Sequence, residues 1–261
     1  MKNAIFFIAA SAIFTGAWAG NVQIQVLDRD GKPVPDAVVV VYPSATTGAA
    51  PSLLQPSPTI EQERMRFVPA VTVVMPGSTV RFTNQDRWDH HVRGNPTGVS
   101  AAAAPAAASS NFELRLAGKV DGKPASFADV KLDTPGVVLL GCHLHGSMRG
   151  HVFVTDSAWT LKTDSDGIAR FASVPDGAAQ VRVWHAEQLV DLPRKNLQVQ
   201  PTPVLDTMQL SVVPRPRRPL PASPRCPTAR PSCACGTPNN WWTCPARICR
   251  FNPPRFSTPC S

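Results

Sequence analysis

The sequence predicts an all-β protein built from antiparallel β-sandwiches. Three observations favour this class: many short runs of alternating or β-branched residues, turn residues such as Gly, Pro, Asn and Asp between them, and no sustained helical period. No alternation of strands with helices and no glycine-rich phosphate-binding loop accompanies these runs. With 261 residues, the chain is long enough for two ordinary domains, each with its own core.

The first 19 residues have the pattern of a cleavable export signal. Lys2 gives a short basic start, residues 4–14 form an apolar run too short to span a bilayer, and residues 17–19 read Ala-Trp-Ala, a typical cleavage site. Residues 1–19 are therefore predicted to be a signal peptide, with the mature chain beginning near Gly20. We expect a periplasmic or secreted protein without a membrane span, and an uncleaved N-terminal anchor is the alternative.

The net charge of +8 belongs to residues 214–261. This tail contains eight Arg and no acidic residue, so the rest of the chain has 18 basic and 18 acidic residues. A neutral globular part argues against nucleic acid as a partner. The tail also holds six of the seven Cys and 12 of the 28 Pro without apolar periodicity, and we expect it to be disordered. A disulfide-bonded knot is the alternative.

The chain after the signal begins with two expected strands. Val22, Ile24 and Val26 alternate with polar residues, residues 28–33 supply turn chemistry, and residues 37–42 are largely β-branched, which predicts a hairpin. Residues 44–57 are rich in Ala, Pro, Ser and Thr without periodicity, and residues 46–65 are expected to form a linker. The first part of a sandwich is therefore placed at residues 20–45.

Further strands are expected in two later blocks. In residues 66–156 the expected strands are 66–68, 71–75, 79–83, 112–116, 137–140 and 150–154, with a polar loop at 84–92 and an Ala-rich insertion at 98–110. In residues 157–213 they are 168–171, 180–184 and 205–213. Each is bounded by Gly, Pro, Asp or Asn, as strands of a sandwich are.

Candidate metal ligands gather in one short segment. Cys142, His145 and Met148 fall within seven residues, and His90 and His91 lie upstream. Sulfur with imidazole is a donor set that selects copper, and two His, one Cys and a weak axial Met form the blue-copper electron-transfer centre. A lone buried Cys is more often an inert small hydrophobe, so the combination carries the prediction. Cys142 follows an apolar strand, which predicts a site at the rim of a sandwich.

Residues 66–156 resemble the cupredoxins, in particular plastocyanin and amicyanin. The resemblance rests on the Pro76-Gly77 turn, the loop from Asn84 to His90-x-Val92, the Pro135-Gly136 turn and the motif Cys142-x2-His145-x2-Met148. It implies a cupredoxin Greek-key β-sandwich with one type 1 copper. The ligands that it implies are His90, Cys142, His145 and Met148.

Two histidines beside this motif leave alternatives open. His91 is the alternative to His90 as a ligand, although neighbours in a strand point to opposite faces. His143 has no counterpart among the family's ligands and could give a different coordination, including zinc. His151 and His185 have no partners at ligand spacing and are expected to be structural.

The blocks on either side resemble a second module. Residues 22–42 and 163–177 resemble the early and late strands of a transthyretin-like or carboxypeptidase-regulatory-like β-sandwich. Together they imply a second, discontinuous sandwich, residues 20–45 and 157–213, interrupted by the cupredoxin domain. The alternative is a set of extra strands on one enlarged sandwich.

The predicted function is that of an exported mononuclear blue-copper electron carrier, which is not an enzyme. The layout also resembles proteins labelled methylamine utilisation protein, which implies a quinoprotein dehydrogenase as electron donor and a cytochrome as acceptor. A periplasmic copper-binding or delivery protein is the alternative. A copper oxidase or nitrite reductase would need a further His-rich copper cluster, and four of the six His already lie at or beside the motif.

Overall fold

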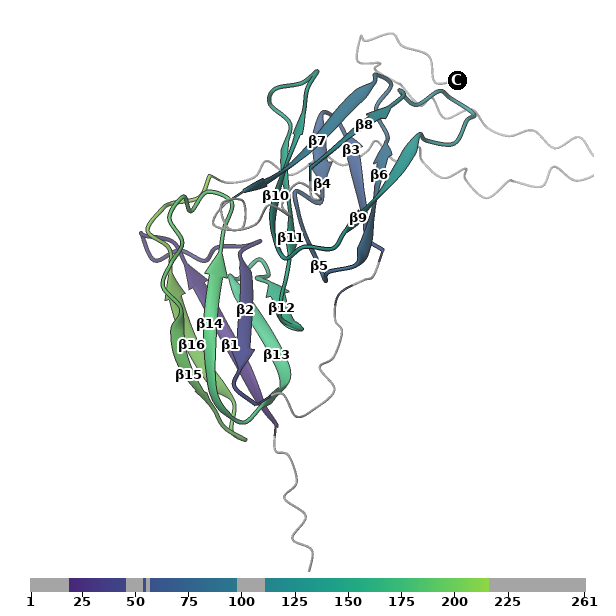
Figure 1. Cartoon of the computed structure of the whole chain (residues 1–261). Helices are drawn as coiled ribbons and strands as arrows, with labels where there is room; N and C mark the ends of the chain where they lie inside the picture. Colours follow the sequence, from purple (N-terminus) through teal and green to yellow (C-terminus); the bar gives the residue numbers. More distant parts are fainter. Residues whose placement is uncertain (1–18, 46–53, 55–56, 98–110, 216–261) are drawn as a thin grey trace, which may run out of the picture. The chain divides into compact units, whose positions relative to one another are not determined.

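The computed structural model describes residues 19–45, 54, 57–97 and 111–215 (Figure 1). Within these ranges the chain forms sixteen strands in four sheets and no helix, which confirms the predicted all-β class. The described residues accordingly contain no helix capable of crossing a membrane. The predicted signal peptide, except for Ala19, and nearly all of the predicted tail lie outside the described residues.

Nine strands, β3 to β11, form two sheets around one hydrophobic core, which we call the central sandwich. The sheet orders are β4-β3-β6-β9 and β5-β11-β10-β7-β8. The core contains apolar side chains from both sheets, among them Ile60, Phe82, Leu116 and Leu140. The bounds are β3 (Thr59–Glu63), β4 (Arg66–Val68), β5 (Val71–Val74), β6 (Ser78–Asn84), β7 (His90–Thr97), β8 (Phe112–Leu116), β9 (Phe127–Leu132), β10 (Gly136–Cys142) and β11 (Arg149–Val154).

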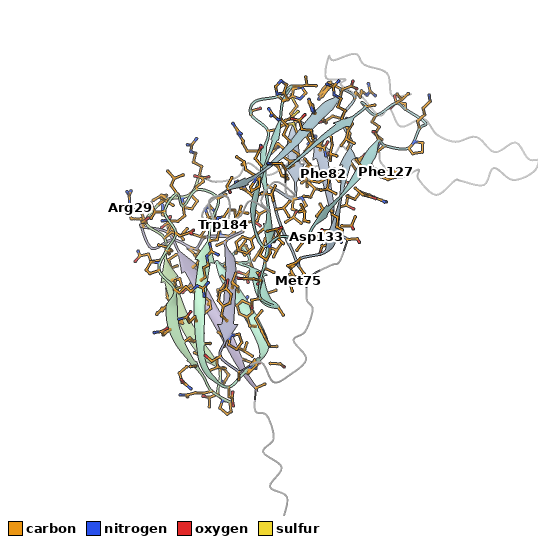
Figure 2. The ribbon with its side chains drawn as sticks, in the orientation of Figure 1. Arg29, Met75, Phe82, Phe127, Asp133 and Trp184 are labelled. Atoms are coloured by element: carbon orange, nitrogen blue, oxygen red, sulfur yellow. The ribbon has the colours of Figure 1, made fainter. Side chains whose placement is uncertain are left out.

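Alternation along β6 shows why the central sandwich has these faces. Val80 and Phe82 are fully buried, whereas Arg81 between them is exposed. On the adjacent strand β9, Phe127 is 56% exposed, and the Arg81 guanidinium carbon lies 4.3 Å from the centroid of its ring. Figure 2 labels both Phe82 and Phe127. The period of two therefore separates core from surface, as the sequence analysis assumed.

Seven strands from both ends of the described chain form the terminal sandwich. Its sheets have the orders β13-β1-β16 and β12-β2-β14-β15, and its core includes Ile24, Val41, Phe171 and Val181. A second sandwich with discontinuous strands is thus present. The bounds are β1 (Ala19–Leu27), β2 (Val38–Pro43), β12 (Trp159–Lys162), β13 (Ile168–Pro175), β14 (Gly177–Trp184), β15 (Lys195–Val199) and β16 (Val204–Gln209).

The hairpin predicted for the first two strands is wrong. Strand β1 pairs antiparallel with β13 and parallel with β16, whereas β2 pairs with β12 and β14 in the other sheet. The segment between the strands forms a turn, with the N–H of Gly31 donating to Asp28 O at 3.0 Å, but the strand pairing there is limited to the isolated bridge between Leu27 and Pro33. Strand β1 buries one apolar face, whereas β2 buries both: Val39 and Val41 lie in the terminal core, and Val38 and Val40 lie in a second cluster. Separate sheets of a sandwich bury these faces better than one hairpin does.

The linker predicted at residues 46–65 is too long at its C-terminal end. Thr59–Glu63 forms β3, which runs parallel to β6 and antiparallel to β4. Its two inward positions are held by Ile60 and Gln62, both fully buried. Because one of these side chains is polar, the apolar alternation that marks a strand is missing from this sequence.

Candidate metal centre

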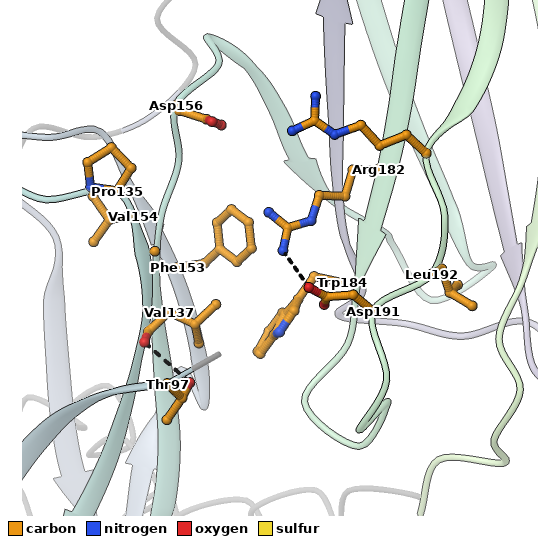
Figure 3. A pocket seen from close by; sticks show the side chains of 12 residues that line it. Thr97, Pro135, Val137, Phe153, Val154, Asp156, Arg182, Trp184, Asp191 and Leu192 are labelled. Atoms are coloured by element: carbon orange, nitrogen blue, oxygen red, sulfur yellow. Dashed lines mark hydrogen bonds and ion pairs between the residues drawn. The ribbon is translucent and has the colours of Figure 1, made fainter. Parts of the chain in front are cut away.

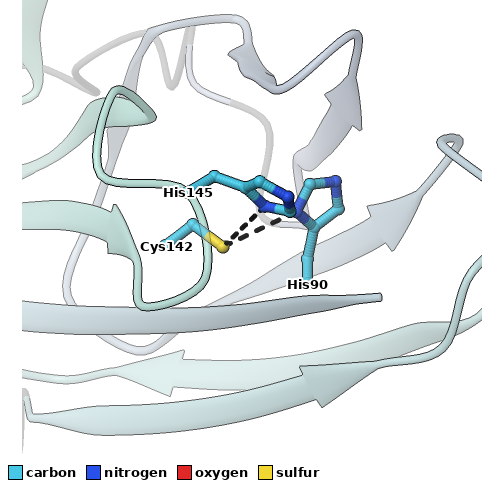
Figure 4. A group of neighbouring side chains, drawn as sticks. All are labelled: His90, Cys142 and His145. Atoms are coloured by element: carbon cyan, nitrogen blue, oxygen red, sulfur yellow. Dashed lines mark hydrogen bonds between the residues drawn. The ribbon is translucent and has the colours of Figure 1, made fainter. Parts of the chain in front are cut away.

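Adjacent antiparallel strands bring the two distant parts of the motif together. His90 opens β7 and Cys142 closes β10, and in the ladder Cys142 lies opposite Val92. Both side chains face the core, and His90 is 1% exposed and Cys142 6% exposed. His145 follows in the turn after β10 and is half-buried. Figure 4 shows the three side chains converging from the strand ends and this turn.

The donor atoms lie within contact distance of one another. Cys142 Sγ is 3.6 Å from His90 Nδ1 and 3.5 Å from His145 Nδ1. The two imidazole rings meet edge to face, with centroids 4.9 Å apart. His90, Cys142 and His145 form the one group of three such donors within 4.8 Å that the described residues contain.

This spacing fits a metal ion held between the three atoms. A tetrahedral ion such as Zn²⁺ lies about 2.3 Å from a thiolate sulfur and about 2.0 Å from an imidazole nitrogen, which separates sulfur from nitrogen by about 3.5 Å. The observed separations of 3.5 and 3.6 Å match that value. One thiolate and two imidazoles also suit copper. The residues present therefore fit the metal that the sequence predicted.

Met148 closes the turn that carries His145. Its backbone N–H donates a hydrogen bond to His145 O at 3.0 Å, and its side chain is 1% exposed. It belongs to the same core cluster as Cys142. A thioether thus lies buried beside the turn that follows Cys142.

Asp86 is a site residue that the sequence analysis missed. Its Oδ2 lies 2.9 Å from His90 Nε2, and both side chains are almost completely buried. A carboxylate accepts, so His90 Nε2 carries the proton and donates it. In a neutral imidazole with this tautomer the lone pair is on Nδ1, the atom 3.6 Å from Cys142 Sγ, and this is the form of imidazole that binds a metal.

The same carboxylate also fixes the turn between β3 and β4. Asp86 accepts backbone N–H groups from Arg64 at 2.6 Å and Met65 at 2.9 Å, two residues with positive φ. Burial raises the pKa of Asp86, but the hydrogen bonds from Met65, His90 and Arg64 outweigh it and hold this pKa below its usual value. The carboxylate beside His90 is therefore ionised at neutral pH.

Asn84 holds the loop that leads to His90. Its Nδ2 donates to the carbonyl oxygens of Trp88, Leu116 and Ala117, at 2.9, 3.2 and 3.0 Å. Its Oδ1 accepts the N–H of Asp86 at 2.9 Å. Asp86 lies two residues after the end of β6 and four before His90, a position that does not by itself distinguish it from other loop carboxylates.

His91 and His143 lie outside the group of three donors. His91 Nε2 is 3.2 Å from Glu113 Oε2, and the rings of His91 and His143 have centroids 5.6 Å apart. His143 is exposed. Of the other two histidines, His151 packs edge to face on Trp184 and His185 is 5% exposed, each apart from that group.

A cavity of about 360 Å³ lies elsewhere, between β10, β11 and β14. Figure 3 shows Phe153 and Trp184 beside the ion pair of Arg182 with Asp191, whose atoms are 3.3 Å apart. None of its described lining residues is Cys or His, and two Arg balance two Asp. It is therefore separate from the candidate metal centre.

Comparisons with known proteins give partial structural likenesses. No protein-family model and no curated protein sequence matches the chain. Similar solved structures include plastocyanin from Dryopteris crassirhizoma (23% identity, 37% of this chain, 99% of that chain, TM-score 0.30) and amicyanin from Paracoccus versutus (19%, 44%, 97%, 0.27). Another is a copper-containing nitrite reductase from Thermus scotoductus (20%, 44%, 25%, 0.30). At these TM-scores the likenesses carry no information on function, which is inferred from the site itself.

Proposed function

We propose that the chain is an exported mononuclear blue-copper electron carrier. His90, Cys142 and His145 bind one type 1 copper, with Met148 as the weak axial ligand. The observation that carries the proposal is the convergence of one thiol and two imidazole nitrogens within 4.8 Å at a buried strand end. Copper in such a site accepts and releases one electron, and a thioether beside thiolate and imidazole favours copper over zinc.

The residues around the donors suit rapid electron transfer. Cys142 is fixed in the β10 ladder, and Asp86 contacts His90 directly. Six further hydrogen bonds of Asp86 and Asn84 fix the loop that leads to His90. Ligands held in this way move little when the charge of the site changes. His145 is the most exposed of the three donors, and it is the point at which an electron enters or leaves.

The compartment and the partners belong to the same proposal. A signal peptide at residues 1–19 would deliver the chain to the periplasm or outside the cell. Partners are redox proteins, with a quinoprotein dehydrogenase as donor and a cytochrome as acceptor. The chain itself catalyses no reaction in this proposal.

Absorption of the copper-loaded protein tests the proposal. We expect an intense visible band from thiolate-to-copper charge transfer, which ascorbate removes and which Cys142→Ser lacks. A variant with Ser at Cys226, Cys233, Cys235, Cys244, Cys249 and Cys260 controls for the tail thiols and should keep the band. A colourless copper complex of the unmodified chain would contradict the proposal.

A copper-delivery protein is the second candidate, supported by His91 and His143. Their rings lie 5.6 Å apart, one residue from His90 and Cys142, and His143 is exposed. In a delivery protein these two imidazoles pass the metal between the site and a recipient. The replacements His91→Ala and His143→Ala separate the two functions, because they should slow copper transfer to a chelator in a delivery protein and leave it unchanged in a carrier.

A further inference from the structure

The outer face of the sheet that holds the metal ligands is basic. Alternation along β7 and β10 sends His90 and Cys142 into the core and their neighbours outward. At the metal end of this face lie Arg93 on β7, Arg115 on β8 and Arg149 on β11, all exposed. We call this surface the arginine face.

Two of these arginines flank a residue without a side chain. In the ladders Gly141 of β10 lies opposite Arg93 of β7 on one side and Arg149 of β11 on the other. A Cβ atom added at Gly141 would lie 3.7 Å from Arg149 Nη1, so that guanidinium lies against the glycine. The Arg93 Nη1 lies 3.3 Å from His143 Nδ1, one residue beyond Cys142. Gly141 thus leaves a position without a side chain between two guanidinium groups, and we call this position the notch.

Few acidic side chains lie near these arginines, so most of the positive charge of the arginine face is uncompensated. Glu113 lies 3.0 Å from Arg93 Nε and also contacts His91. Asp89, at the edge of the face, accepts the N–H of Gly118 at 2.7 Å. Among the described residues, no carboxylate lies within salt-bridge distance of Arg115 or Arg149, so two of the three arginines have no acidic partner.

The rest of this chain cannot supply the missing carboxylate side chains. All 18 Asp and Glu lie within the described ranges, so residues 1–18, 46–53, 55–56, 98–110 and 216–261 contain none. Farther along the same face, Val137 and Phe153 are buried in a cluster with Val38 and Val40. A partner therefore has access to the metal end of the face, where the unpaired arginines lie.

We propose that the arginine face docks a carboxylate-rich patch of an acidic redox protein, with one partner carboxylate in the notch at Gly141. Arginine binds carboxylate through paired hydrogen bonds, and a patch of one sign accelerates encounter with a patch of the other. The notch is one peptide unit from Cys142, so docking there gives a short covalent path to the thiolate. The redox character of the partner rests on the proposed function, whereas its acidity rests on the face alone.

Binding of a redox-inactive anion tests the face without reference to electron transfer. Paramagnetic hexacyanochromate(III) is added at low ionic strength to the full-length ¹⁵N-labelled protein, first without metal and then loaded with diamagnetic Cu(I), because Cu(II) would itself broaden the Gly141 amide. We expect selective broadening of the Gly141 amide, which Arg93→Glu/Arg149→Glu abolishes. The matched control Arg81→Glu/Lys131→Glu makes the same change in net charge on the other sheet of the central sandwich and should keep the broadening.

Kinetics of the copper-loaded protein extend the test to electron transfer. One electron passes from the reduced protein to hexacyanoferrate(III), which becomes hexacyanoferrate(II). At low ionic strength we expect Arg93→Glu/Arg149→Glu to lower this rate constant at least about tenfold, and the control pair to lower it much less. Salt should remove the difference, because exposed charges are screened beyond about 10 Å at 0.1 M.

Three outcomes would overturn the proposal. The first is no broadening at Gly141, and the second is equal loss of binding in both double variants. The third is self-association of the unmodified chain that Arg93→Glu/Arg149→Glu abolishes, since the occupant would then be a second copy. If anion binding behaves as expected but copper gives no charge-transfer band, the proposed function fails and the acidic docking surface stands.

Discussion

The two sandwiches share an architecture but differ in what holds them together. The terminal sandwich packs apolar side chains around one core, and its described buried polar groups, which include Thr160, Thr163, Asp28 and His185, form no group of three metal donors. The central sandwich has a similar apolar core, but one end is occupied by Asn84, Asp86 and His90. Hydrogen bonds rather than apolar contacts fix this end. Its metal chemistry should therefore be separable from its stability.

Removal of a buried imidazole is the strongest way to separate the two properties. We expect His90→Ala to abolish the charge-transfer band of the copper-loaded protein, because one of three converging donors is lost. His91→Ala is the matched control, since that side chain faces the other side of β7, and it should keep the band. Loss of the band in His91→Ala and its retention in His90→Ala would reverse the assignment.

Truncation of a core aromatic tests the comparison from the other side. Phe171 is 2% exposed in the terminal core, and Phe171→Ala should lower the free energy of unfolding of that sandwich by about 3–5 kcal/mol. Chemical denaturation measures the loss, while the absorption of bound copper reports on the central sandwich. Phe82→Ala should do the reverse, because Phe82 lies in the central core. If Phe171→Ala also abolished the copper absorption, the two sandwiches would unfold as one unit.

A smaller change at the polar end of the central sandwich should weaken metal binding without unfolding the protein. Asp86→Asn keeps the size of the side chain but replaces the carboxylate by a neutral amide. The carboxylate accepts hydrogen bonds from His90 and from the β3–β4 turn. We expect copper affinity to fall about 10- to 100-fold, as for other partners of metal-bound histidine. Competition with a chelator measures it. Asp129→Asn, at an exposed ion pair with Arg81, is the control and should leave affinity unchanged.

The smallest expected effect concerns acid stability of the terminal sandwich. The N–H of Ile168 and the guanidinium of Arg170 hold the pKa of Asp164 below its usual value. A lowered carboxyl pKa stabilises the fold above the unfolded value, about 3.9, and that contribution is lost as the pH falls through the folded pKa. In Asp164→Asn the free energy of unfolding, measured by chemical denaturation at several pH values, should therefore fall less steeply as the pH drops below about 4. An unchanged limb would show that other carboxylates set it.

Local pattern was enough to place many strands and the metal motif. The alternation in Ser78–Asn84 and the apolar run in Gly136–Cys142 marked β6 and β10 because each buries a regular set of side chains. Positions at strand ends predicted that His90 or His91 would approach Cys142, and the structure brings His90 there. Strand β15 was missed because only Leu197 and Val199 mark its period, and β9 was missed although its side chains alternate regularly between core and surface.

Neither the pairing of the strands nor the contact of Asp86 with the ligand His90 could be predicted from local pattern. Val22 lies opposite Phe171 and Val204, and nothing near Val22 in the sequence specifies those partners. Asp86 resembled an ordinary loop aspartate, because its burial is created by the β3–β4 turn that folds over it. Both failures concern contacts between distant segments, which sequence periodicity does not report.

The discontinuous terminal sandwich has a consequence for the order of events on the ribosome. The central sandwich is complete once residue 154 has emerged, whereas β1 must wait for β13 and β16. At a translation rate of ~5–20 residues per second, the backbone groups of β1 remain unpaired for several seconds after their own synthesis. Unpaired strands are sites of aggregation, so a chaperone that shields β1 should raise the yield of this protein more than that of a truncated central sandwich.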